Sequence, residues 1–298
     1  MSWQVTSYSY LLYRSKKEAG VVEDRDLDLP DHDEEMGGEP PVAEPDPSSI
    51  FAFPKGARAG TFLHDIFENL DFAGKDAAQT ANLVAAKLGQ YGYEARWQET
   101  LCRMIEKVLA VPLDLEQADL TLSRVGRKNR LNELEFYFPL QAISPGKLGG
   151  ILSGQQGLSL SGEPPARIEE LDFRPARGFM KGFMDLVFQF QGRYYLVDWK
   201  SNFLGARVED YGPRRLAEEM EENFYTLQYR LYVLALHEYL KHRVLGYSYA
   251  RHFGGVFYVF LRGVSPEKGP EFGIYRDLPR EDFVRALSES LIARPGFG

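Results

Sequence analysis

Two short runs of mainly apolar and aromatic side chains, separated by Gln191 and Gly192, fill residues 183–200, and this pattern predicts a β-hairpin. The first arm, residues 183–190, is apolar and aromatic. The return arm is residues 193–200, and Gln191 with Gly192 makes the turn between them. The hairpin is the strongest local prediction in the chain, and the candidate chemistry lies on it.

Two acidic residues face each other across this predicted hairpin. With a two-residue turn, Asp185 lies opposite Asp198, and like charges at opposed positions are destabilising. Lys200 lies on the same face as Asp198, because strand side chains alternate with a period of two. A divalent cation bound between the carboxylates is the most economical explanation, since carboxylate oxygens are its preferred ligands. Two carboxylates and a lysine on one face are typical of metal-assisted phosphodiester hydrolysis.

Apolar residues at helical spacing predict helices before and after the hairpin. In the first of these helices His64 and Glu68 lie one turn apart, although an isolated histidine on such a helix is most often structural. In the long helix after the hairpin Gln228 and Tyr232 lie one turn apart, and this pair gains functional weight only if its face meets the hairpin. The predicted helices cover residues 60–72, 76–90, 94–110, 214–222, 223–243 and 281–293, and further strands cover residues 132–140 and 247–263.

The order of the elements is helices, strand, hairpin, helix, strand and helix. This order favours a sheet flanked by helices, in the α/β or α+β class. The 298 residues allow one large domain or two small ones. Residues 18–50 are rich in Asp, Glu, Pro and Gly and are predicted to be a disordered loop or linker. Residues 141–165 are rich in Gly, Ser and Pro with a helical turn at 147–152, and residues 1–15 suit a short strand or a helix start.

The charge of the chain is unevenly distributed. The net charge is −8, but residues 18–46 hold 12 acidic side chains and one basic one, so the other residues carry a net charge of +3. A nucleic-acid partner is therefore compatible with the composition. Four basic residues precede the strand at 132, and a solvated turn and a phosphate-contacting patch explain them about equally well. These residues are Arg124, Arg127, Lys128 and Arg130.

Several classes of protein are excluded or disfavoured. No apolar run is long enough to span a bilayer and no signal peptide is recognisable, so a cytoplasmic location without membrane attachment is expected. The single cysteine, Cys102, excludes an intramolecular disulfide and a cysteine cage for zinc or iron–sulfur. Neither a GxxxxGK[ST] phosphate loop nor a GxSxG nucleophile elbow is present.

The chain resembles the PD-(D/E)xK nuclease superfamily, and within it the C-terminal nuclease domain of RecB subunits of exodeoxyribonuclease V. The resemblance is carried by GFMKGFMDLVF and YYLVDWKSNFLG in the hairpin, with GTFLHDIFENLDF, QYRLYVLALHEYL and HFGGVFYVFLRG elsewhere. It covers most of the chain outside residues 15–55 and 141–165. It implies a restriction-endonuclease-like core, a mixed central sheet flanked by helices, in a single RecB-like nuclease domain over residues 1–298. The helicase domain of a full RecB subunit is not recognisable, which leaves an excised domain or a free-standing gene product.

The resemblance also implies which residues form the site. The catalytic set would be Asp185, Asp198, Lys200, Gln228 and Tyr232. A Mg²⁺ ion, replaceable by Mn²⁺ or Ca²⁺, would be held by His64, Asp185, Asp198 and the main-chain carbonyl of Trp199. The family often has Tyr at position 199, and Met184 replaces the Pro of the superfamily's name. Glu133 would be an accessory acidic residue.

The implied function is a Mg²⁺-dependent DNA nuclease, exo- and endonucleolytic with single-strand cleavage, within a RecBCD-type helicase-nuclease for double-strand-break repair. Its partners would be DNA, in single-stranded form, and RecC- and RecD-like subunits. Candidate DNA contacts are Arg124, Arg127, Lys128 and Arg251. Two alternatives remain: a non-catalytic module of the same fold that guides DNA or docks a subunit, and a free-standing nuclease of this superfamily serving another pathway.

Overall fold

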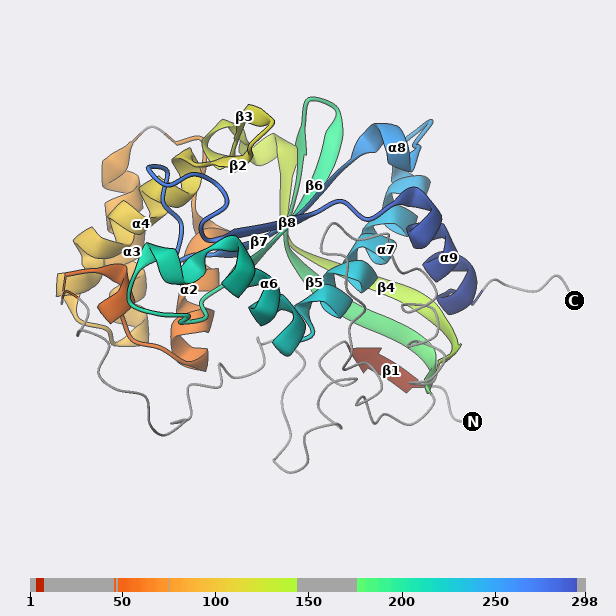
Figure 1. Cartoon of the computed structure of the whole chain (residues 1–298), viewed down its shortest axis with the longest axis horizontal. Helices are drawn as coiled ribbons and strands as arrows, with labels where there is room; N and C mark the ends of the chain where they lie inside the picture. The colour runs from red at the N-terminus through yellow and green to blue at the C-terminus, as the bar shows by residue number, and fades with distance from the viewer. Residues whose placement is uncertain (1–3, 8–45, 47, 75, 144–175, 294–298) are drawn as a thin grey trace, which may run out of the picture.

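A central mixed sheet with helices on both faces forms the core of the molecule, as the sequence predicts (Figure 1). The computed structural model describes residues 4–7, 46, 48–74, 76–143 and 176–293. The predicted acidic linker therefore falls mostly outside the described residues, and so does the predicted helical turn at 147–152. No helix in the described ranges is long and apolar enough to cross a membrane.

The sheet has six strands in the order β1-β5-β6-β7-β8, with β4 paired to β5. Its strands are β1 (Gln4–Ser7), β4 (Arg130–Ile143), β5 (Ala176–Phe190), β6 (Arg193–Lys200), β7 (Phe253–Phe260) and β8 (Ile274–Asp277). β5 is antiparallel to β4 and β6 and parallel to β1, while β6 is parallel to β7 and β7 antiparallel to β8. A separate two-stranded sheet contains β2 (Pro112–Asp114) and β3 (Gln117–Thr121). The short strands β2, β3 and β8 are absent from the sequence prediction.

Two helical layers enclose the sheet, and Figure 1 shows them on opposite sides. The first layer is α2 (Ala57–Asn69), α3 (Ala77–Tyr91) and α4 (Gln98–Ala110), and the second is α6 (Pro213–Glu222), α7 (Tyr225–Arg243) and α9 (Glu281–Leu291). Each layer packs its own hydrophobic core against the sheet. The predicted strand over residues 247–263 begins only at Phe253, because the single-turn helix α8 (Tyr249–His252) precedes it.

The hairpin between β5 and β6 has the predicted register. Gln191 and Gly192 both have positive φ, 48° and 79°, which is the conformation of a two-residue type I′ turn. Phe190 pairs with Arg193, and the ladder continues regularly along the two strands. Glycine adopts such a φ without steric cost, which explains its place at the second position.

Half-way along β5, the regular alternation of its side chains between the two faces of the sheet is interrupted. Met184 packs into the core beneath α7, whereas Leu186 packs into the core beneath α2–α4. In a regular strand residues two apart share one face, so the alternation is interrupted between them. Asp185 is the residue at the interruption.

The neighbouring strand β4 changes faces at the matching position. Asn132 donates a hydrogen bond to the Glu68 carbonyl of α2, while Leu134 packs against the core beneath α7. Between them Glu133 has a φ of 50°, a left-handed conformation that is uncommon for residues other than glycine. The pairing of β4 with β5 places Glu133 next to Asp185 across the strands.

The long helix α7 is tied to the far edge of the sheet by a buried polar contact. The Tyr229 hydroxyl donates a 2.7 Å hydrogen bond to Oδ2 of Asp277 in β8. Burial raises the pKa of Asp277 and of Tyr229 above their ordinary values. A protonated or hydrogen-bonded pair can be buried at low cost, so the contact fixes α7 over the sheet.

Candidate active site

A cleft of about 480 Å³ opens where the two helical layers meet the interruption in β4 and β5. Its walls come from α2, α3, the strands β4 to β6 and α7. The lining side chains that bear polar or aromatic groups include His64, Asp65, Glu68, Lys87, Glu133, Phe183, Asp185, Asp198, Gln228 and Tyr232. The residues of the predicted site are thus mostly gathered at one place.

Asp185 lies where the β5–β6 ladder ends. The last ladder pair is Leu186 with Val197. Beyond it the side-chain Oδ2 of Asp185 accepts a 2.8 Å hydrogen bond from the main-chain N–H of Trp199. The carboxylate therefore bridges the strands as they separate, and this bond fixes its orientation at the cleft.

The helix α2 brings His64 to the end of β6. A side chain at Gly60, one turn earlier, would place its Cβ 3.1 Å from Oγ of Ser201, so glycine allows the close approach of helix and strand. Nε2 of His64 lies 2.9 Å from the Trp199 carbonyl oxygen, and Nδ1 lies 3.5 Å from Oδ1 of Asp185. The His64 imidazole contacts groups of the cleft, which distinguishes it from a histidine that only fills the core.

Three side chains could hold a divalent ion together. One potential ligand atom each of His64, Glu133 and Asp185 lies within 4.8 Å of the other two. Ca²⁺ binds oxygen at about 2.3–2.6 Å and Mg²⁺ at about 2.0–2.1 Å, so ligands of one ion lie up to roughly 4–5 Å apart. Two carboxylates, an imidazole nitrogen and the nearby Trp199 carbonyl make a donor set that fits a hard divalent ion.

Asp198 lines the same cleft but is engaged by a lysine. Nζ of Lys200 lies 2.7 Å from Oδ2 of Asp198, and the two side chains are 0% and 5% exposed. The ammonium also lies 3.9 Å from the ring centroid of Tyr225. A buried charge needs such compensation, which the carboxylate and the ring face supply. The structure therefore places Asp198 beside Lys200, and it groups Glu133, expected only as an accessory acidic residue, with His64 and Asp185.

The Gln228 and Tyr232 face of α7 does meet the hairpin. Oε1 of Gln228 accepts hydrogen bonds from the Tyr258 hydroxyl at 2.8 Å and from Nζ of Lys200 at 3.5 Å. Its Nε2 donates to the Tyr232 hydroxyl at 3.2 Å. This chain of hydrogen bonds connects α7 to the catalytic candidate Lys200 on β6.

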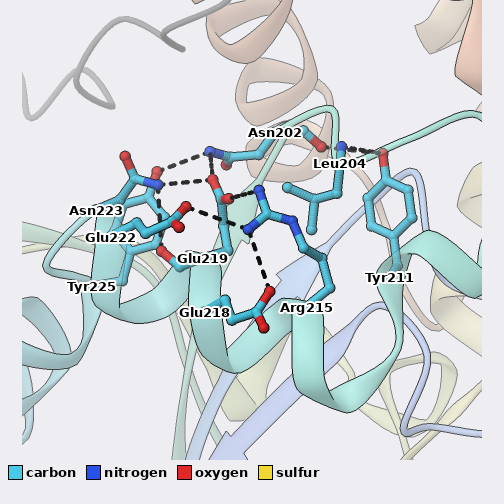
Figure 2. Close-up of polar contacts among 9 residues, drawn as sticks. All are labelled: Asn202, Leu204, Tyr211, Arg215, Glu218, Glu219, Glu222, Asn223 and Tyr225. Carbon is cyan, nitrogen blue, oxygen red and sulfur yellow. Dashed lines mark hydrogen bonds and ion pairs between the residues drawn. The ribbon is translucent and has the colours of Figure 1, made fainter. Parts of the chain in front are cut away.

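A buried polar network supports the site behind Lys200, and Figure 2 shows its members pointing toward one another. Nδ2 of Asn202, just past β6, donates to Oε1 of Glu219 at 3.0 Å and to the Tyr225 hydroxyl at 3.2 Å. Glu219 also accepts from Arg215 at 2.9 Å and from Asn223 at 2.8 Å. The network joins the end of β6 to α6 and to the first turn of α7, where the ring that faces Lys200 lies.

The four basic residues expected to contact DNA do not line the cleft. Nη1 of Arg124 lies 3.2 Å from Asp119, and Nε of Arg127 lies 3.7 Å from Asp71, so acidic neighbours offset both charges. Lys128 lies in the short 3-10 helix before β4, and Arg251 lies in α8. The lysine that lines the cleft is Lys87, which contacts both carboxylate oxygens of Asp65 at 2.7 Å.

Some residues of the site carry no clear sequence signal. Glu133 is expected only as an accessory group, because its left-handed φ is invisible in the strand pattern. Tyr225 and Tyr258 contact Lys200 and Gln228, yet each occurs in a run of aromatic residues that predicts ordinary packing. A tyrosine inside a fully apolar strand is the one hint, since a buried hydroxyl requires a partner.

Comparison with known proteins agrees with this geometry. A sequence model of the PD-(D/E)XK nuclease superfamily matches residues 47–294. The chain is 40% identical over 289 residues to the RecBCD enzyme subunit RecB of Escherichia coli (strain K12), covering 97% of this chain and 23% of that protein. It is 33% identical over 294 residues to RecB of Haemophilus influenzae, covering 96% and 23%.

A third relative gives a comparable result. RecB of Mycolicibacterium smegmatis is 32% identical over 326 residues, covering 98% of this chain and 29% of that protein. The chain thus spans about a quarter of the length of these curated relatives. The family match over residues 47–294 includes both helical layers and the residues that line the cleft, and leaves out β1. The chain belongs to the PD-(D/E)XK nuclease superfamily.

Proposed function

We propose that this chain is a Mg²⁺-dependent deoxyribonuclease that cleaves the phosphodiester bonds of single-stranded DNA. The observation that carries the proposal is the cluster of His64, Glu133 and Asp185, with ligand atoms within 4.8 Å of one another. Asp198 lines the same cleft, and the buried Lys200 ammonium lies 2.7 Å from its carboxylate. Superfamily membership supports the nuclease assignment.

The residues divide into ligands and supporting groups. His64, Glu133, Asp185, Asp198 and the Trp199 carbonyl would hold the ion. When bound, Mg²⁺ supplies polarisation of the phosphate and a lowered pKa of the attacking water.

The remaining residues act on the water and on the developing charge. In our proposal Lys200 orients the attacking water or stabilises the negative charge that builds on the phosphate. Gln228 accepts a hydrogen bond from Lys200, and the Tyr258 hydroxyl donates to the same Gln228 oxygen, so the two residues hold the lysine in place. Tyr232 restrains the Gln228 amide, so the rotamer of Gln228 is fixed from two sides.

The relatives suggest a larger assembly. The matched proteins are described as RecB subunits of the RecBCD enzyme. By analogy this chain would be the nuclease domain of a RecB-type subunit, with RecC- and RecD-like partners, in DNA repair. Mn²⁺ and Ca²⁺ would compete for its metal site, because both accept the same oxygen-rich donor set.

The central test replaces Lys200 by Ala and measures degradation of end-labelled single-stranded DNA with Mg²⁺. Loss of a charge that acts in the transition state should lower kcat by at least about a hundred-fold. Lys241→Ala is the matched control, because this lysine lies on the surface of α7 outside the cleft lining, where it pairs with Glu238 at 3.1 Å. The control should retain full activity.

A second variant, Asp185→Asn, tests the metal assignment by calorimetric titration with Mn²⁺. Loss of one carboxylate charge should weaken binding at least about ten-fold.

Folded Lys200→Ala protein with wild-type activity would refute the catalytic assignment. A folded wild-type protein that binds single-stranded DNA without ever cleaving it would favour the alternative, a non-catalytic DNA-guiding module.

A further inference from the structure

The outer halves of β4 and β5 present a row of side chains that begins at the cleft. In these outer halves, which run from the change of faces at Glu133 and Asp185 toward residue 143 of β4 and residue 176 of β5, the odd-numbered side chains lie on the face away from the core beneath α7. On β5 these residues are Phe183, Lys181 and Phe179. Across from them on β4 the pairing places Glu135, Tyr137 and Pro139.

The aromatic members of this row are accessible. Tyr137 is 54% exposed and Phe179 is 41% exposed, which is unusual for large rings in strands. Phe183 lines the cleft itself. Phe183, Lys181, Tyr137 and Phe179 are called the aromatic strip below.

A lysine lies between the rings of the strip. Nζ of Lys181 is 5.3 Å from the ring centroid of Phe183 and 5.7 Å from that of Tyr137. It also lies 3.4 Å from Oε1 of Glu135, which accepts a hydrogen bond from the Tyr137 hydroxyl. The negative charge of Glu135 is therefore compensated locally, and the strip does not repel a polyanion as an uncompensated carboxylate would.

We propose that the aromatic strip is a stacking surface for the bases of single-stranded DNA, along which the strand leaves or enters the cleft. This inference rests on the proposed nuclease function. Side chains on one face of a strand repeat every two residues, roughly 6.6–6.8 Å, so Phe183, Lys181 and Phe179 form evenly spaced steps away from Asp185. Every base offers a flat face to such rings, whatever the sequence.

Single-stranded DNA fits the strip better than duplex DNA. A phosphodiester that reaches Asp185 continues into a chain on at least one side, and the strip is continuous with the cleft through Phe183. Bases of a duplex are stacked on one another and cannot lie on protein rings. On the opposite wall of the cleft Glu68 presents a carboxylate, which a DNA strand avoids.

The test measures binding of a fluorescent oligothymidylate of about 16 nucleotides by anisotropy, with Ca²⁺ in place of Mg²⁺. Phe179→Ala and Tyr137→Ala should each weaken binding about ten-fold, the effect of one lost base–aromatic stack. Phe179→Trp should bind at least as tightly as the wild type. The control is Leu245→Ala, which removes a fully exposed apolar side chain outside the strip.

Kinetics and a duplex ligand give independent readouts. With Mg²⁺, both alanine variants should raise KM for the oligothymidylate and leave kcat unchanged, because neither residue touches the reacting phosphate. Binding of a blunt duplex of the same length should not depend on Phe179.

Unchanged affinity for the single strand in both variants would overturn the inference, as would equal losses for single strand and duplex. If the wild type binds but never cleaves, the nuclease proposal fails, and the anisotropy comparison still decides whether the strip binds DNA.

Discussion

The backbone of Glu133 is the clearest residue-level sign of a functional constraint. A left-handed φ at a residue other than glycine costs of order 1–3 kcal/mol and persists only where the surroundings impose it. Here β4 is paired to β5 on both sides of Glu133, through Asn132 and Leu134. The strained conformation points the Glu133 carboxylate at His64 and Asp185 instead of following the alternation of the strand.

Replacing Glu133 by Asn should separate its structural cost from its function. Asn tolerates the left-handed region, so the free energy of unfolding should change by less than about 1 kcal/mol. Affinity for Mn²⁺, measured by calorimetry, should fall at least about ten-fold because a ligand charge is lost. Glu135→Gln is the control on the same strand, and it should leave metal affinity unchanged. Equal metal affinity in Glu133→Asn would remove this residue from the ligand set.

Sequence reasoning reaches the two aspartates and the lysine for a simple reason. A tight turn fixes register as far as the last ladder pair, Leu186 with Val197, so the hairpin brings Asp185 and Asp198 to the positions just beyond that pair, with Lys200 two residues after Asp198. The predicted direct opposition of the two aspartates lies beyond the regular ladder, where the alternation of β5 is interrupted. Which aspartate pairs with the lysine, and which lies beside His64, does not follow from the hairpin pattern. Whether Asp198 lies beside Lys200 or beside His64 depends on side-chain rotamers and on a distant helix, which local pattern does not encode.

Among the elements, α6 supports the site through one buried carboxylate. The Glu219 side chain is 8% exposed and accepts hydrogen bonds from Arg215, Asn202 and Asn223, whereas Glu218 on the same helix is 43% exposed (Figure 2). Buried carboxylates with several donors are costly to remove, because the donors lose their partners. Exposed pairs contribute little.

Glu219→Ala should therefore lower the free energy of unfolding in urea by about 3 kcal/mol. Glu218→Ala should change it by less than about 0.5 kcal/mol. Because Asn202 and Tyr225 adjoin Lys200, Glu219→Ala should also lower kcat, while Glu218→Ala should not. A loss of stability without any change in kcat would show that the network holds the fold together but not the lysine.

The long, strongly periodic elements are the ones that the sequence predicts well. α2 has apolar residues at consistent helical spacing, although it begins and ends three residues earlier than the predicted 60–72. α7 is apolar on nearly all sides over 19 residues, which is too long for a strand, and the hairpin is defined by its two-residue turn. β2 and β8 are only three and four residues long, too short for a period to be recognised. At the start of the segment predicted as one strand over 247–263, the short helix α8 shows that local apolar content does not distinguish a strand from a helical turn.

At the scale of the whole molecule, the excess negative charge lies in residues 18–45, outside the segments that line the cleft. Residues 18–45 carry 11 acidic side chains and one basic one, so their removal changes the net charge from −8 to +2. An acidic segment competes with DNA phosphates for basic groups and repels the strand. Both effects are screened by salt beyond about 10 Å at 0.1 M.

Deleting residues 18–45 should tighten binding of single-stranded DNA about ten-fold at low ionic strength. The gain should shrink as salt rises, because it is electrostatic. A full-length variant with the same acidic residues changed to Asn and Gln is the control for chain length and should show the same gain. If the advantage of the deletion persists undiminished at high salt, charge is not its cause.

The change of faces in β4 and β5 has a consequence for how the protein unfolds. Since β5 contributes Met184 to one hydrophobic core and Leu186 to the other, neither core can be lost while the other keeps its full strand. Two layers that would otherwise resemble separate subdomains are thereby made into one cooperative unit. The candidate site lies at the point where the two cores exchange strand faces. Partly unfolded forms that retain only one layer would therefore have no assembled site and could not cut DNA indiscriminately.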